Sequence, residues 1–236
     1  MPRENGETER ASLAEIILDP LEIEPDPAEV LRYLGYPSGA TPNGRIQERV
    51  RQAIETSRGQ LHPRGTYAIY DVTAQDEQSL TLAGWAKFTG QVGDFLGRST
   101  RAAVFLATAG PEIVELAERA LRGRDTMGGL AYNALGSQLA EAVVGRLVED
   151  LGRHAGPGES LTLRYSPGYC GISLAQQRTI FRLVDAVRLG VELLPTLIMK
   201  PVKSVSGLIG IGPEAAVAAY GTPCDRCPSL DCRMRR

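Results

Sequence analysis

Histidine is scarce in this chain of 236 residues: only His62 and His154 occur, and neither lies beside an obvious nucleophile. This scarcity argues against a hydrolase of the Ser-His-Asp or Cys-His type, which needs a histidine base. Long apolar runs are also missing, since a stretch such as 102–110 is far too short to span a bilayer. The formal net charge is only −2. The composition therefore favours neither nucleic acid nor an anionic membrane as the main partner.

The composition is that of a soluble globular protein. Hydrophobic residues make up 43% of the chain and charged residues 23%, which is ordinary for such a domain. The N-terminal residues 1–12 are polar and lack the apolar core of a secretion signal. The sequence therefore predicts a cytoplasmic protein, long enough to bury a sizeable core in one large domain or two small ones.

Strand and helix patterns are mixed along the chain. Helical spacing and capping residues predict helices at 26–37, 43–59, 110–123, 129–152, 174–190 and 213–221. Alternation and apolar runs predict strands at 65–72, 79–84, 102–108 and 160–165, and a strand pair within 196–212. Because the order lacks a strict βαβ rhythm, an α+β domain is favoured over a doubly wound sheet.

The longest predicted helix carries two distinct faces. Its expected core stripe consists of Leu135, Leu139, Val143 and Leu147. A second face, small and polar, repeats every four residues at Asn133, Ser137, Glu141 and Gly145.

The turn sequence "LRYSPGYC" (163–170) combines groups suited to a small charged ligand. The planar guanidinium of Arg164 suits a carboxylate, Gly168 permits positive φ or close backbone approach, and Tyr169 offers a flat face. A zwitterionic ligand would also need an anion, which Glu141 can supply. The alternative is an ordinary turn, in which Arg164 pairs with any surface acid and Tyr169 belongs to the core.

Cysteine is concentrated at the C-terminus, where Cys224, Cys227 and Cys232 follow the spacing Cys-x2-Cys-x4-Cys. In a cytoplasmic chain such a cluster indicates metal or redox chemistry before a structural disulfide. Three thiolates can ligate zinc or an iron–sulfur cluster, with Cys170 as a possible fourth ligand. Unligated thiols or a redox disulfide remain the alternatives.

Five stretches, taken in order, resemble the reactivation domain of cobalamin-dependent methionine synthase in its stand-alone form. They are "EVLRYLGY" (29–36), "ATAG" (107–110), "LGSQLAEAVVGRL" (135–147), "RYSPGYC" (164–170) and "TLIMKPVKSVSGLIGIG" (196–212). The resemblance implies an α+β fold with a mixed, largely antiparallel twisted sheet and flanking helices. It implies an activation-like domain at 15–221, between a disordered tail at 1–14 and a cysteine-rich tail at 222–236.

The same resemblance implies a binding site for S-adenosylmethionine. Its residues would be Asp26, Glu141, Arg164, Gly168, Tyr169, Ile209 and Gly210. Arg164, Gly168 and Tyr169 match the family's Arg-x-x-x-Gly-Tyr motif, and Glu141 would face the methionyl ammonium. Fused members of the family usually have aromatic residues where this chain has Ile209 and Gly210. Tyr169 would lie near the cobalt face, where it can influence axial water.

The activity implied by the resemblance is an accessory methyl transfer. Cobalamin that has been oxidised to inactive Co(II) is returned to methylcobalamin by one electron and a methyl group from S-adenosylmethionine. The cobalamin would be carried by a separate methionine synthase or another corrinoid protein, and the electron would come from a donor such as flavodoxin or ferredoxin. Two alternatives remain: a non-catalytic partner of a corrinoid protein, and a small iron–sulfur or zinc protein in electron transfer.

Overall fold

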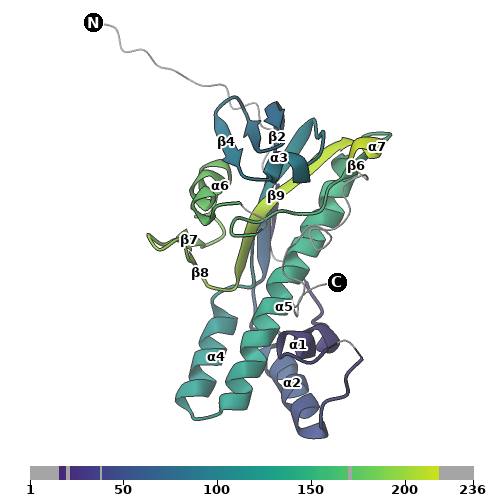
Figure 1. Ribbon diagram of the computed structural model, residues 1–236. Helices are drawn as coiled ribbons and strands as arrows, with labels where there is room; N and C mark the ends of the chain where they lie inside the picture. Colours follow the sequence, from purple (N-terminus) through teal and green to yellow (C-terminus); the bar gives the residue numbers. More distant parts are fainter. Residues whose placement is uncertain (1–15, 20–21, 38, 170–171, 218–236) are drawn as a thin grey trace, which may run out of the picture.

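The structure is a computed structural model that describes residues 16–19, 22–37, 39–169 and 172–217. A seven-stranded sheet forms its centre, and helices cover both faces (Figure 1). The strands are β1 (Ile16–Leu18), β2 (Arg64–Asp76), β3 (Ser79–Leu82), β4 (Ala86–Thr89), β5 (Arg101–Thr108), β6 (Glu159–Leu161) and β9 (Ser204–Pro213). Their order is β4-β3-β2-β5-β9-β6, and β1 pairs with β2.

Every pair of neighbouring strands in this sheet is antiparallel. The helices are α1 (Pro27–Tyr33), α2 (Gly44–Ser57), α3 (Val92–Phe95), α4 (Glu112–Arg122), α5 (Thr126–Leu151), α6 (Gln177–Leu183) and α7 (Glu214–Val217), with 3-10 turns at Gly152–His154 and Leu174–Gln176. The predicted α+β class with a largely antiparallel sheet is confirmed. No helix in the described part of the chain has the length and apolar character needed to cross a membrane.

Strand β5 lies in the middle of the sheet and is buried on both faces. Ala102, Val104 and Leu106 contribute to one core cluster, while Ala103 and Phe105 contribute to another. Successive side chains of a strand point to opposite faces. A strand covered on both sides therefore has a continuous apolar sequence, as 102–107 does.

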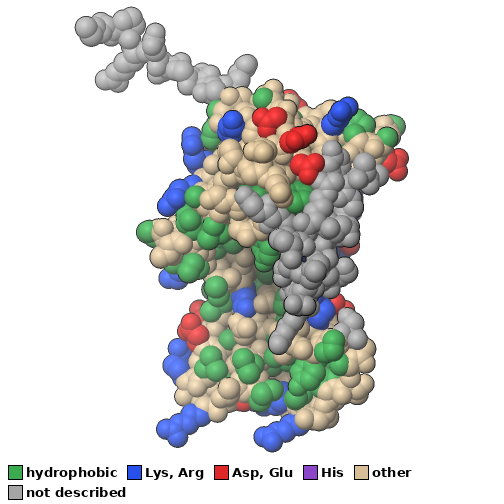
Figure 2. Space-filling view, in the orientation of Figure 1, with side chains coloured by type: hydrophobic (Ala, Val, Ile, Leu, Met, Phe, Trp, Pro, Cys, Tyr) green, Lys and Arg blue, Asp and Glu red, His purple; other side chains and the backbone are tan. Residues whose placement is uncertain are grey.

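Helix α5 belongs to two cores at once. Its first half packs with α1, α2 and α4 in a helical cluster that includes Leu135 and Leu139. Its second half lies on the sheet, where Val143 and Leu147 pack against β2, β5 and β9. The predicted apolar stripe is therefore confirmed. Figure 2 shows the molecule narrowing between its sheet part and its helical part, and α5 runs through both.

Two expectations near the C-terminal half are wrong. The helix predicted at 174–190 ends at Leu183, because Val184 adopts extended geometry. The apolar residues that follow, such as Leu189 and Val191, are buried against the sheet cluster without being helical. The stretches within 196–212 also do not pair with each other. Strand β8 (Met199–Lys200) pairs with β7 (Glu192–Leu193), whereas β9 pairs with β5 and β6.

Candidate functional site

The segment after β6 continues along β9 and positions Arg164. The N–H of Thr162 donates to the carbonyl of Gly210 at 2.9 Å, and Tyr165 exchanges two backbone hydrogen bonds of 2.8 Å with Leu208. Tyr165 is buried and stacks on Phe95 with ring centroids 4.5 Å apart. Because neighbouring side chains on an extended segment alternate, Arg164 points to the opposite face, which α5 covers.

Arg164 and Glu141 form an ion pair across this face. A guanidinium N–H of Arg164 donates to the Glu141 carboxylate, and 37% and 33% of the two side chains remain exposed. The predicted polar face of α5 is confirmed at this position. Its partner is the glutamate that the sequence singled out. An ordinary surface ion pair has the same contact, so the binding of a ligand at this pair stays a prediction.

The turn at 166–169 presents Tyr169 to solvent. Gly168 has φ = +93°, and its N–H donates to the carbonyl of Ile172 at 2.8 Å. A Cβ at Gly168 would meet only the Leu174 side chain, at an ordinary 3.5 Å. Glycine is therefore required by the backbone conformation rather than by lack of space. Tyr169 is 70% exposed, so the alternative in which it belongs to the core is wrong, and its contact with a ligand stays a prediction.

Tyr33, at the end of α1, was not singled out by the sequence reasoning. It lies within electrostatic reach of both members of the ion pair: burial raises the pKa of its phenol, and Glu141 raises it further, while Arg32 and Arg164 oppose the shift. The Arg32 guanidinium lies 5.0 Å from the Tyr33 ring centroid. Its place in "LRYLGY" was the only feature of the sequence that pointed to Tyr33. Its nearness to Glu141 depends on the packing of α1 against α5, which are far apart in the sequence.

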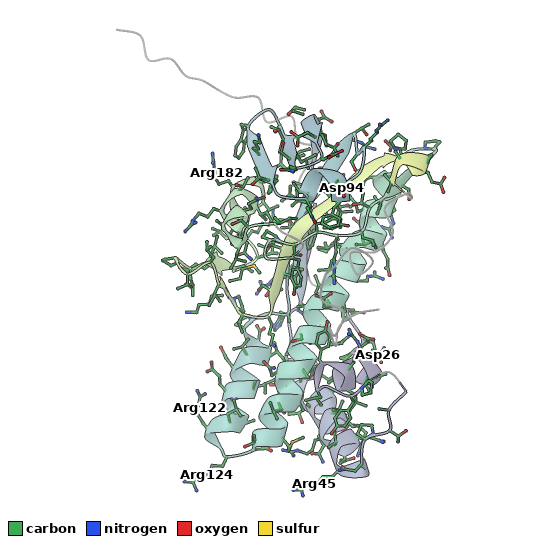
Figure 3. The ribbon with its side chains drawn as sticks, viewed as in Figure 1. Asp26, Arg45, Asp94, Arg122, Arg124 and Arg182 are labelled. Atoms are coloured by element: carbon green, nitrogen blue, oxygen red, sulfur yellow. The ribbon has the colours of Figure 1, made fainter. Side chains whose placement is uncertain are left out.

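The structure gives Asp26 a local role. It is the N-cap of α1, and its carboxylate accepts hydrogen bonds from the N–H groups of Ala28 at 2.8 Å and Glu29 at 3.4 Å. Asp26 is exposed and lies beside α1 (Figure 3). Its expected contact with a ligand stays a prediction.

Ile209 and Gly210 lie in the middle of β9. The Ile209 side chain is 1% exposed and belongs to the cluster beneath α5. Gly210 donates its N–H to the Thr162 hydroxyl at 2.8 Å, and a Cβ there would lie 2.9 Å from the Thr162 methyl group. Close strand packing accounts for both residues, and their contribution to a ligand site stays a prediction.

Comparison with known proteins identifies the group to which these features belong. Residues 86–222 match the protein family described as "Vitamin B12 dependent methionine synthase, activation domain". The chain belongs to this family. The match covers Glu141, the 164–169 turn and β9, whereas Asp26 and Tyr33 precede it.

The fold of this activation-domain chain is shared with a solved structure. It matches the structure described as "Crystal Structure of the MetH Reactivation Domain bound to AdoHcy" with a TM-score of 0.64 and 18% sequence identity, over 84% of this chain and 78% of that chain. Among curated proteins, no sequence match is found.

The proposed metal ligands of this family member lie outside the described residues. This applies to Cys170, Cys224, Cys227 and Cys232 alike. Within the residues that the structure does describe, no group of three or more His, Cys, Asp or Glu side chains is arranged to hold a metal ion. Zinc or iron–sulfur ligation by the cysteines stays a prediction.

An open cavity of about 540 Å³ lies at the far end of the activation domain, between α2 and the turn joining α4 to α5. Arg45, Arg49, Arg124 and Asp125 are among its lining residues, and Figure 3 shows Arg45 and Arg124 at this end. Glu141 lies 15 residues after Thr126 on α5, so about 22 Å of helix separates the cavity from the ion pair. The cavity is not part of the candidate site.

Proposed function

We propose that this chain binds S-adenosylmethionine with the amino-acid end of the ligand between Arg164 and Glu141. Without ligand, the two side chains neutralise each other. The zwitterionic end carries the same two charges, so its carboxylate can take the place of Glu141 on Arg164, and its ammonium the place of Arg164 on Glu141. Charge-assisted hydrogen bonds are formed at both ends, and no charge is left unpaired.

The partly exposed Arg164–Glu141 pair is the observation that carries this proposal, and the exposed Tyr169 follows Arg164 by five residues in the same turn segment. Two further facts support it. The chain belongs to the activation-domain family, and the solved structure with the shared fold is bound to AdoHcy. AdoHcy, S-adenosylhomocysteine, is what remains of S-adenosylmethionine after its methyl group is transferred.

The proposed reaction is the reductive methylation of cobalamin. One electron reduces Co(II) to Co(I), and the Co(I) electron pair attacks the methyl carbon of the sulfonium. The carbon–sulfur bond breaks, its electron pair stays on sulfur, and methyl-Co(III) and S-adenosylhomocysteine result. The irreversible methyl transfer draws the unfavourable reduction forward. The chain holds the methyl donor in line with cobalt, and no proton is transferred.

The cobalamin is proposed to arrive on a separate corrinoid protein, with methionine synthase as the first candidate. Neither histidine of the chain stands in an Asp-x-His-x-x-Gly sequence of the kind that carries the lower ligand of cobalamin. The electron is proposed to come from a flavodoxin or ferredoxin. Tyr169, with its ring in solvent, is proposed to approach the cobalt face of the partner's cobalamin.

A labelled methyl group tests this proposal. The corrinoid protein in its Co(II) state is mixed with a chemical reductant, methyl-labelled S-adenosylmethionine and this chain, and label on cobalamin is followed with the visible spectrum of methylcobalamin. We expect label transfer that depends on the chain. Binding of S-adenosylmethionine with no label on cobalamin would instead indicate a non-catalytic partner of the corrinoid protein.

Asp26 can be tested separately for its two roles. Asparagine caps helices about as well as aspartate, so Asp26→Asn should leave the free energy of unfolding within about 0.5 kcal/mol of the wild type. If the carboxylate also contacts the ligand, the same variant should weaken S-adenosylmethionine binding by about tenfold, as expected for one charged hydrogen bond. Urea denaturation and calorimetry measure the two effects. Unchanged affinity in a stable Asp26→Asn protein would restrict Asp26 to capping.

A further inference from the structure

Lys203 is a half-buried ammonium group that neither the family match nor the proposed reaction explains. Its backbone is held at the end of β5, because its carbonyl accepts hydrogen bonds from the N–H of Ala109 at 2.9 Å and the hydroxyl of Thr108 at 3.4 Å. Its side chain crosses α5 at Gly136, where an added Cβ would lie 2.9 Å from the Lys203 Cγ. The ammonium group ends on α5, 2.8 Å from the Ser137 hydroxyl.

Among the described residues, the Lys203 ammonium has no counter-charge within ion-pair distance. Within the described residues it has no carboxylate partner, and burial lowers the pKa of its amine. Ser137 donates its own hydroxyl proton to the carbonyl of Asn133 at 3.2 Å, so it accepts from Lys203. An ammonium group has three N–H donors, and Ser137 takes one of them. Two donors therefore remain for an anion, and a half-buried cation is stabilised by one.

Ser137 places this cation next to Glu141. The two residues are four apart in α5 and lie on the same polar face, which puts their Cβ atoms about 6 Å apart. An amino-acid head group that hydrogen-bonds at both ends spans a similar length. Arg164 is already paired with Glu141, whereas Lys203 has no ionic partner among the residues that the structure describes. Of the two cations, Lys203 can therefore accept a carboxylate without the loss of an existing ion pair.

We propose that Lys203, held in place by Ser137, is a binding residue for the carboxylate of the ligand's amino-acid end, beside Glu141 and Arg164. The inference rests on the proposed binding of S-adenosylmethionine and adds a contact to the same site. A merely structural lysine would tie β9 to α5 and affect stability alone.

Decarboxylated S-adenosylmethionine separates these two roles, because it keeps the sulfonium and the ammonium but lacks the carboxylate. Calorimetry on the full chain compares both ligands with the wild type and Lys203→Met, in which the unbranched stem is kept and the charge removed. We expect Lys203→Met to weaken S-adenosylmethionine about tenfold, as for one charge-assisted hydrogen bond. Affinity for the decarboxylated form should stay within about twofold, because that form makes no such bond.

The matched control is Lys200→Met, which removes an exposed lysine of β8 and should change neither affinity. Equal losses for both ligands, or no loss for either, in a Lys203→Met protein with wild-type thermal unfolding would overturn the assignment of Lys203 and leave the proposed function standing. A wild-type chain that binds neither ligand would overturn both proposals together. Ser137→Ala should show part of the same loss of affinity for S-adenosylmethionine but not for its decarboxylated form, because it removes the hydrogen bond that positions the Lys203 ammonium.

Discussion

Replacing Arg164 with alanine should reduce S-adenosylmethionine affinity by about 100-fold, because a guanidinium that pairs in two places with a carboxylate contributes about 3 kcal/mol. The loss has two sources. The ligand carboxylate loses its planar partner, and Glu141 is left with no cation among its described contacts. Calorimetry measures the affinity. The fold should be retained, since a partly exposed ion pair contributes at most about 1 kcal/mol.

A second arginine serves as the matched control for this prediction. Arg146 lies five residues after Glu141 on α5. It pairs with Glu149 at 3.1 Å, and more than half of each of the two side chains is exposed. Arg146→Ala should leave both affinity and stability unchanged. If Arg164→Ala binds the ligand within threefold of the wild type while remaining folded, the ligand does not lie at the Arg164–Glu141 pair, and the proposed function loses its main support.

The helices α1, α2 and α5 were predicted from the sequence, because capping residues and apolar spacing within a few turns determine them. Asp26 is the N-cap of α1, as its position before a periodic segment indicated, and the periodic segment that follows Asn43 forms α2. The apolar stripe of α5 follows from spacing alone, because every fourth residue returns to the same face. In these cases the residues that decide the structure lie within one or two turns of each other.

The errors arise where distant partners decide the structure. Residues after Leu183 are apolar at helical spacing, yet Val184 is extended and Leu189 is buried against the sheet. Burial in the core cluster on one face of the sheet thus replaced the helix that the pattern favours. The pairing of β9 was also mispredicted, since its register with β5, such as Ala103 opposite Ile209, depends on residues about 100 positions away. No local pattern encodes that choice.

The candidate site divides in the same way. Glu141 was singled out by its face on α5 and Arg164 by its turn, and both were assigned to one ligand site, but their direct ion pair was not predicted. The nearness of Tyr33 and the bond between Lys203 and Ser137 were not predicted. Both depend on how α1 and β9 pack against α5, and neither residue stands in a distinctive local sequence.

A large effect on the fold is expected from Gly207→Ala in β9. A Cβ at this position would lie 2.3 Å from the carbonyl oxygen of Tyr165 and 2.9 Å from the Phe105 ring. The Tyr165 carbonyl cannot retreat freely, because it accepts the Leu208 N–H at 2.8 Å. Overpacking of a close-packed core costs about 1–3 kcal/mol, and we expect the upper end because backbone must move. Urea denaturation measures the loss of unfolding free energy.

A shift of the Tyr165 backbone should also move Arg164 away from Glu141. Arg164 directly precedes Tyr165, and its position depends on the two backbone hydrogen bonds between Tyr165 and Leu208 of β9. Gly207→Ala is therefore expected to lose ligand affinity as well as stability. Gly145→Ala is the matched control: it lies in α5 with no atom within 4 Å of an added Cβ, and alanine in a helix interior is favoured over glycine by about 0.5–1 kcal/mol. The same substitution should thus stabilise one position and destabilise the other. A Gly207→Ala protein as stable as the wild type would mean that the segment at Tyr165 does not pack on β9 this closely.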